Sequence, residues 1–203
     1  MTRGLIKVSA AIRIRVAALV CGAVLLCANA VVAADQAKAL AYRTLDPAQF
    51  QNTVKNWNDA KYPVLVAVIR NLDEWNAVFQ PTPVMGTNRP FAPDAVLFER
   101  EAILLAARVM PAAPGWQHAL QVGKVLQTPD RLTLAYRYAK SARAASFTVK
   151  HYLMVRVPRG LWQQVVFIEN GATVGTLDIG KGQWSLPAAG AADDSHETRE
   201  RPR

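Results

Sequence analysis

The side chains best able to do chemistry in this sequence are two histidines and the carboxylates around them. His118 begins an alternating run two positions after the turn PAAPGW, and His151 lies on the apolar face of a predicted strand, where a histidine usually packs in the core. A metal site would require both histidines to meet a carboxylate such as Glu99 or Glu101. Nothing in the spacing of these residues requires that arrangement, so the sequence predicts neither a metal site nor a cofactor.

Nucleophilic and phosphate chemistry have less support still. None of Ser141, Ser146 and Ser185 lies in a Gly-x-Ser-x-Gly elbow. The glycines of GATVGTLDIGKG, residues 171–182, have the wrong spacing for a phosphate-binding loop. We therefore assign no catalytic residue from the sequence.

The turn PAAPGW offers a different kind of candidate, an aromatic anchor for a partner. Trp116 follows Gly115 at a turn that is expected to lie at the surface. Aromatic side chains in such places are enriched at interfaces. In the alternative interpretation, the indole folds over the sheet edge and covers the core. We predict Trp116, His118 and Arg89 as partner-binding residues.

Residues 1–34 have the pattern of a secretory signal peptide. A basic leader without acidic residues precedes an uncharged stretch from Val16 to Ala34, which closes with small residues at alternating positions. An uncleaved membrane anchor is the alternative, because this stretch approaches the ~20 residues that a spanning helix needs. The pattern predicts export to the periplasm or out of the cell, with membrane contact only if the leader is retained.

Both cysteines, Cys21 and Cys27, lie in this leader, so the mature chain is expected to have none. Thiol chemistry, disulfides and cysteine-held zinc are then excluded, and a core of about 150 residues must hold the fold by itself. Loss of the leader removes four basic residues and lowers the formal charge from +9 to +5. The remaining charges form no clustered basic face, which argues against nucleic-acid binding.

Two segments carry helix start signals. Residues 45–57 could form a short helix, with Asp46 as its cap and a proline at the first helical position. Asn71 and Glu74 have the spacing of a capping box and predict a helix over residues 71–79. The four prolines between residues 80 and 93 deny the backbone its hydrogen-bond donors, so that segment is expected to be a loop.

Most of the remaining chain predicts strands. Two continuous apolar runs suit strands covered on both faces. Four later runs form an antiparallel series, in which three alternate with one face exposed to solvent and residues 163–169 are apolar on both faces, as in a central strand. A last short strand is expected near the end. The predicted strands are residues 63–70, 102–110, 118–127, 132–138, 147–157, 163–169 and 173–179.

Together these elements predict one α+β domain over residues 45–184. It would hold a largely antiparallel sheet of about six strands, with one or two short helices packed on one face. A linker, residues 35–44, would join it to the signal peptide. Residues 185–203 are small, charged and free of aromatics, so they are expected to be disordered.

The order of these motifs also resembles a known family. A strand leads into a helix with Glu74 and Trp75, and PDAVLFEREAILLAARV then leads to the turn PGW, HALQVGKVLQTPDRLTLAYRY, HYLMVRVPRG and VVFIEN. This order resembles the C-terminal domain of the protease-complex-subunit family (PrcB-like), a module of exported bacterial proteins. The turn lacks the second glycine of that family, and Asp94 and Phe98 stand apart where the family has them together. The resemblance implies an accessory or binding module of protease or envelope complexes, with no catalytic residue to carry over.

The sequence therefore favours a non-enzymatic periplasmic or envelope module that docks a protein partner, such as a protease complex, or a small ligand. One alternative is a hydrolase or lyase with its site around His118, His151 and Glu99. Another is a structural or stress-response envelope protein without a defined ligand. An enzyme should gather at least two titratable side chains in one concave pocket. A binding module should expose an aromatic or apolar patch near residues 80–93 or 111–117.

Overall fold

The described part of the chain is mostly β-structure. The computed structural model describes residues 37–141, 143 and 145–186, and these residues form twelve strands in three sheets with only two α-helices. The predicted α+β domain with about six strands is therefore wrong. The error arose because several edge strands are only two or three residues long, too short to leave a periodic pattern.

Sheet A has five strands in the order β1-β7-β8-β10-β11. All its neighbouring pairs are antiparallel except β8 and β10, which run parallel. The predicted antiparallel series is thus interrupted, because β9 lies between β8 and β10 in the chain but belongs to the other sheet. The strands are β1 (Lys38–Ala39), β7 (Leu120–Gln127), β8 (Arg131–Tyr138), β10 (Gln164–Glu169) and β11 (Ala172–Asp178).

Sheet B also has five strands, in the order β12-β4-β6-β9-β2, and every pair in it is antiparallel. A two-stranded sheet of β3 (Asn52–Val54) and β5 (Phe79–Pro81) completes the set. The strands of sheet B are β12 (Ser185–Leu186), β4 (Val64–Ile69), β6 (Glu101–Pro111), β9 (Thr148–Pro158) and β2 (Arg43–Leu45).

Sheets A and B enclose the larger of two hydrophobic cores. Alternate residues of β4 and β6, such as Val66 and Leu104, meet Leu132, Leu134 and Phe167 from sheet A, and all five are fully buried. Side chains alternate between the two faces of a strand, so the other half of β4 and β6 points to the opposite face of sheet B.

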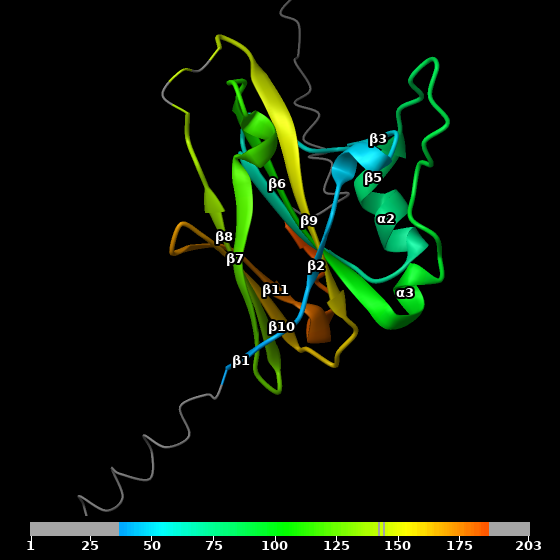
Figure 1. Cartoon of the computed structure of the whole chain (residues 1–203). Helices are drawn as coiled ribbons and strands as arrows, with labels where there is room; N and C mark the ends of the chain where they lie inside the picture. The colour runs from blue at the N-terminus through cyan, green and yellow to red at the C-terminus, as the bar shows by residue number, and fades with distance from the viewer. Residues whose placement is uncertain (1–36, 142, 144, 187–203) are drawn as a thin grey trace, which may run out of the picture. The chain divides into compact units, whose positions relative to one another are not determined.

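The second core covers that opposite face. It contains helix α2 (Leu72–Val78), helix α3 (Leu97–Arg100) and the β3–β5 pair, which Figure 1 shows on the side of sheet B away from sheet A. Trp75 is almost fully buried there against Leu65, Ile69 and Ile103 of the sheet. Both faces of the central strands are thus covered, as their continuous apolar runs predict.

The start of α2 confirms the predicted helix signal with one change. The Asn71 side chain accepts a hydrogen bond from the Glu74 amide at 2.8 Å, as an N-cap should. The Glu74 carboxylate, however, accepts from the backbone amide and the guanidinium of Arg70 rather than from Asn71. The predicted helix over residues 45–57 is wrong except for one 3₁₀ turn, Pro47–Gln49, which Asp46 caps.

Polar groups close one end of the core between the sheets. Arg108 of β6 forms an ion pair with Glu169 of β10 across the sandwich, and its guanidinium carbon lies 4.1 Å from the ring centroid of Tyr138. Burial and the neighbouring Glu169 carboxylate raise the pKa of Tyr136, so its phenol stays neutral. Trp162, almost fully buried after β9, also packs in this core.

The predicted domain boundaries can be compared with the structure only in part. The expected signal peptide, residues 1–34, and residues 187–203 of the expected tail lie outside the described residues. Residues 38–39 and 43–44 of the expected linker lie in β1 and β2, and residues 185–186 form β12. Neither α-helix of the described residues is long and apolar enough to cross a membrane.

Gly175 of β11 sets how closely sheet A approaches sheet B. A Cβ at this position would lie 2.6 Å from Cγ2 of Val66. We expect Gly175→Ala to lower the free energy of unfolding by about 1–3 kcal/mol, because overpacking forces the sheets apart. Urea denaturation measures this. Adding Val66→Ala should recover part of the loss in the double variant. A Gly175→Ala protein as stable as wild type would contradict this account of the packing.

Candidate functional site

Trp116 packs onto the end of the sandwich rather than projecting from it. It opens the 3₁₀ turn Trp116–His118, which Gly115 introduces with a φ of 74°. Its ring lies edge-on to the imidazole of His151 in β9, with the centroids 5.2 Å apart, and its side chain is half-buried. This geometry matches the alternative in which the indole covers the sheet edge.

His118 is exposed beside Trp116, in a hollow of about 220 Å³. Tyr138 and Lys140 share this hollow, so it does hold more than one titratable side chain. His151 is not among its lining residues. The structure therefore brings Trp116 and His118 together, and it places His151 beneath the indole.

The proposed His118, His151 and Glu99 centre does not assemble. Glu99 lies in α3 before the start of β6, whereas His151 pairs with Arg108 near the other end of that strand. At a rise of about 3.3 Å per residue, this separates Glu99 and His151 by roughly 20 Å. The other carboxylate considered, Glu101, is paired with Arg156 at 2.5 Å. The described residues contain no group of three or more His, Cys, Asp or Glu side chains placed to hold a metal ion.

The segment between β5 and α3 has a more distinctive construction. We call residues 82–93 the 82–93 loop. Gln51, a buried residue between β2 and β3, holds it with both ends of its amide. Its Nε2 donates to the carbonyls of Thr87 at 3.1 Å and Arg89 at 2.9 Å, and its Oε1 accepts from the amide of Val84 at 2.8 Å.

Further hydrogen bonds hold the base of the 82–93 loop. The backbone of Gln51 bonds to Pro90 and Thr82, each at 2.9 Å. The carbonyl of Phe91 accepts from the Trp75 indole at 3.1 Å and from the side-chain Nδ2 of Asn52 at 3.0 Å. The loop therefore has a fixed conformation although it contains no helix or strand.

Arg89, the third predicted partner-binding residue, belongs to this loop and lies apart from Trp116 and His118. Its guanidinium Nη1 donates to the carbonyl of Ala48 at 2.5 Å. That contact ties the loop to the turn after β2. Its position is thus that of an anchor for the loop, although the side chain remains exposed.

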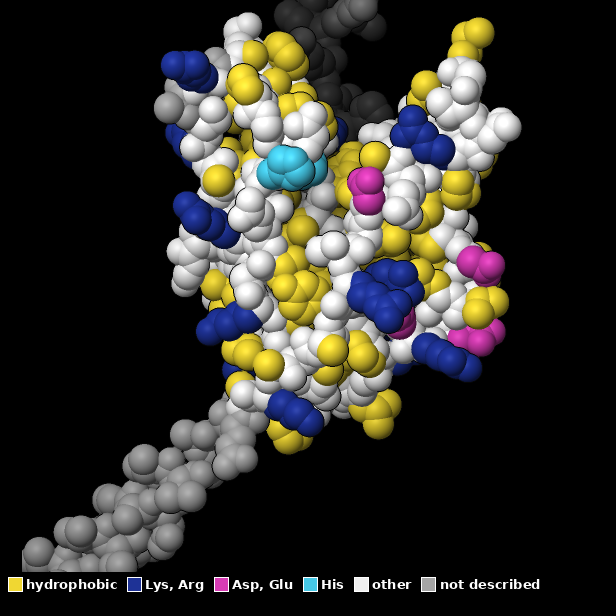
Figure 2. All heavy atoms as spheres, viewed as in Figure 1, with side chains coloured by type: hydrophobic (Ala, Val, Ile, Leu, Met, Phe, Trp, Pro, Cys, Tyr) yellow, Lys and Arg dark blue, Asp and Glu magenta, His cyan; other side chains and the backbone are white. Residues whose placement is uncertain are grey.

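The tip of the 82–93 loop presents apolar side chains to solvent. Met85 is 99% exposed and Val84 is 54% exposed, and Phe91 nearer the base is 44% exposed. Gly86 adopts a φ of 78°, which allows the chain to turn directly after Met85. Figure 2 shows hydrophobic side chains at the end of this projection, at the upper right.

Sequence reasoning missed Gln51, Val84 and Met85. The prolines predicted a loop over residues 80–93, which is confirmed for residues 82–93, whereas residues 80–81 lie in β5. Neither its fixed conformation nor its display of apolar side chains has a local signal, because the anchoring residue, Gln51, lies more than thirty positions away in the chain. Comparison of the chain with family models, curated proteins and solved structures found no match.

Gln51 provides a direct test of the anchoring. Replacing it with alanine removes the acceptor for the Val84 amide and leaves two carbonyls without their donor. We expect the Val84 amide of Gln51→Ala to exchange its hydrogen about tenfold faster or more, with a stability loss of about 1–3 kcal/mol. Hydrogen exchange followed by NMR measures this. Gln49→Ala, at an exposed glutamine nearby, should leave the exchange rate unchanged, and an unchanged rate in Gln51→Ala would refute the anchoring.

His151 should make the fold sensitive to mild acid. Burial lowers its pKa, while a backbone hydrogen bond with Gln117 opposes this. In the unfolded chain His151 takes up a proton near the ordinary histidine pKa of about 6.5, whereas in the folded chain it does so only at lower pH. The free energy of unfolding therefore falls as the pH drops below about 6.5. Between pH 7.5 and 5, the free energy of unfolding should depend less steeply on pH in His151→Gln than in wild type. His118→Gln should change the slope much less than His151→Gln, because it removes only a neighbouring charge that adds to the lowering of the His151 pKa by burial.

Proposed function

We propose that this protein is an exported binding module, without enzymatic activity, that docks a protein partner through the tip of the 82–93 loop. The observation that carries the proposal is the pairing of an anchored backbone with a solvent-exposed apolar tip, Val84 and Met85. Export is proposed from the signal-peptide pattern of residues 1–34.

The energetics of association favour such a loop as a docking element. An exposed methionine and valine lose unfavourable contact with water when a partner covers them. The loop backbone is already fixed by Gln51, so little conformational entropy remains to be lost on binding. Methionine also adapts its shape to an apolar surface. The partner surface expected from this chemistry is an apolar groove.

The resemblance to PrcB-like domains suggests where the partner would be found. That family implies a protease or envelope complex, and we propose such a complex as the source of the partner. The alternative hydrolase or lyase centre of His118, His151 and Glu99 gains no support, because Glu99 lies roughly 20 Å from His151.

Serine substitutions at the tip test the proposal. We expect Val84→Ser combined with Met85→Ser to reduce partner recovery at least tenfold in pull-downs from envelope extract of the source organism, with unchanged stability. Val96→Ser is the matched control, because Val96 is also apolar and 61% exposed but lies outside the loop. Its recovered proteins should equal those of wild type.

A photo-crosslinking residue identifies direct contact. Placed at position 85 it should join the protein that the tip variant fails to recover, and placed at position 96 it should not. Equal recovery by wild type and the tip variant would contradict the proposed function. Loss in Trp116→Ala, with no loss in the tip variant, would move the docking surface to the turn around Trp116.

A further inference from the structure

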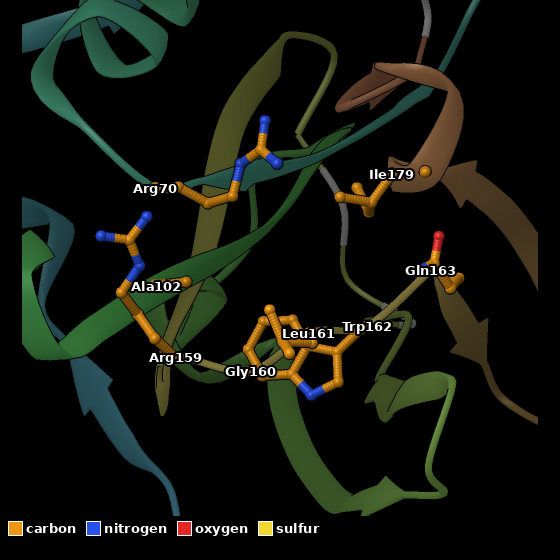
Figure 3. Close-up of a pocket in the computed structure, with 9 residues that line it drawn as sticks. Arg70, Ala102, Arg159, Gly160, Leu161, Trp162, Gln163 and Ile179 are labelled. Atoms are coloured by element: carbon orange, nitrogen blue, oxygen red, sulfur yellow. The ribbon is translucent and has the colours of Figure 1, made fainter.

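A second site is indicated by a hollow of about 550 Å³ beside the segment that follows β9. Residues 159–163, RGLWQ, carry the chain from sheet B to sheet A. The hollow is lined by Arg159, Leu161, Trp162 and Gln163 from this segment, and by Arg70 and Ile179 from elsewhere. In Figure 3 the two arginines lie on one side of the hollow, Ile179 and Gln163 on the other, and Trp162 between them.

The wall of this hollow is built by close backbone approaches. A Cβ at Gly160 would lie 2.5 Å from the indole nitrogen of Trp162, so only glycine lets the indole fold over the segment. A Cβ at Gly180 would lie 2.2 Å from Oε1 of Gln163, which is the end of a flexible side chain and can move aside. The amide of Arg159 donates to the carbonyl of Arg100 at 2.8 Å, which fixes the start of the segment.

The two arginines differ in their charge balance. Arg70 is neutralised by Glu74, whose carboxylate accepts from its guanidinium at 3.0 Å through Nε and again through Nη2. Arg159 forms no ion pair with any of the described residues; its Nη1 donates to the carbonyl of Phe98 at 2.9 Å. This bond orients the guanidinium and leaves its other N–H groups available. The hollow therefore carries one uncompensated positive charge.

An apolar surface faces this charge. Trp162 and Ile179 line the hollow, and Leu161 at its rim is 93% exposed. Covering so exposed a leucine with an apolar group is favourable, because it removes apolar surface from water. The volume lies within the ~300–1,000 Å³ usual for small-molecule sites, which combine apolar walls with a few fixed polar groups.

We propose that this hollow binds a small molecule that carries a single carboxylate on an apolar body. Arg159 holds the carboxylate, since a guanidinium matches that group in shape and charge. Leu161 and Ile179 cover the apolar body, on a wall that is backed by the buried Trp162. A doubly charged phosphate fits less well, because the Glu74 carboxylate next to Arg70 repels the second charge. This site does not depend on the docking function, which uses the 82–93 loop.

Isothermal titration of the full-length protein with 3-phenylpropionate tests the site. We expect saturable binding with a Kd below about 1 mM, the range of a small ligand with one charged contact. Its neutral amide and inorganic phosphate should each bind at least tenfold more weakly. No saturable binding of the carboxylate, or equal binding of the amide or of phosphate, overturns the proposal.

Two variants locate the ligand. Arg159→Gln should weaken binding about tenfold or more, because a charge-assisted hydrogen bond is lost. Arg100→Gln is the control, since Arg100 is an exposed arginine near the hollow that does not line it, and its affinity should match wild type. Leu161→Ala removes only an exposed side chain, so it should fold normally and bind severalfold more weakly. If Arg159→Gln does not fold, the Leu161→Ala result decides: unchanged affinity overturns the proposal.

Discussion

The rest of this structure depends on one requirement, that sheet B be buried on both faces. Val66 and Val68 of β4 point into the core shared with sheet A, while Leu65 and Ile69 point into the core under α2. A strand of this kind is stable only if two separate layers cover it. Sheet A provides the first layer, and the helices with the β3–β5 pair provide the second (Figure 1).

The second layer also positions the 82–93 loop. Trp75 lies in the core beneath α2 and its indole N–H holds the carbonyl of Phe91. Gln51, just before β3, donates a hydrogen bond from its side chain to the carbonyl of Thr87 in the loop. The residues that cover sheet B are thus the residues that fix the loop backbone, and the apolar tip is presented from a rigid base. The same connection links hydrophobic burial to the proposed docking function.

Local signals in the sequence were sufficient for elements whose chemistry is contained in a few residues. The Asn71 cap, the buried runs of β4 and β6 and the proline-rich loop are of this kind. The sheet to which β9 belongs was not predictable, because the alternation of apolar and polar residues in β9 is typical of a strand with one face exposed to solvent. In fact Met154 is buried on the second face, and Arg156 is accommodated there by Glu101. Such pairing partners are distant in sequence and follow no fixed spacing.

In the candidate sites, too, the sequence shows the local motif but not the contacts that the motif makes with distant residues. The turn with Trp116 was visible as a motif, but whether the indole points outward depends on His151 from another strand. The 82–93 loop was visible as a loop, but its anchor and its exposed tip were not. Arg159 and Leu161 gave no signal, because a charge without a partner is a property of the folded arrangement.

The parallel pairing of β8 and β10 has a consequence for how the chain folds. These strands become neighbours only after the intervening chain has passed through sheet B as β9, which pairs there with β6 over eleven positions. Sheet A therefore cannot close by zipping successive hairpins together. Long-range pairing of this type raises the contact order and slows folding. During that delay the backbone hydrogen-bonding groups on the β8 edge have no partner strand, so the folding chain can pair through this edge with other copies of itself.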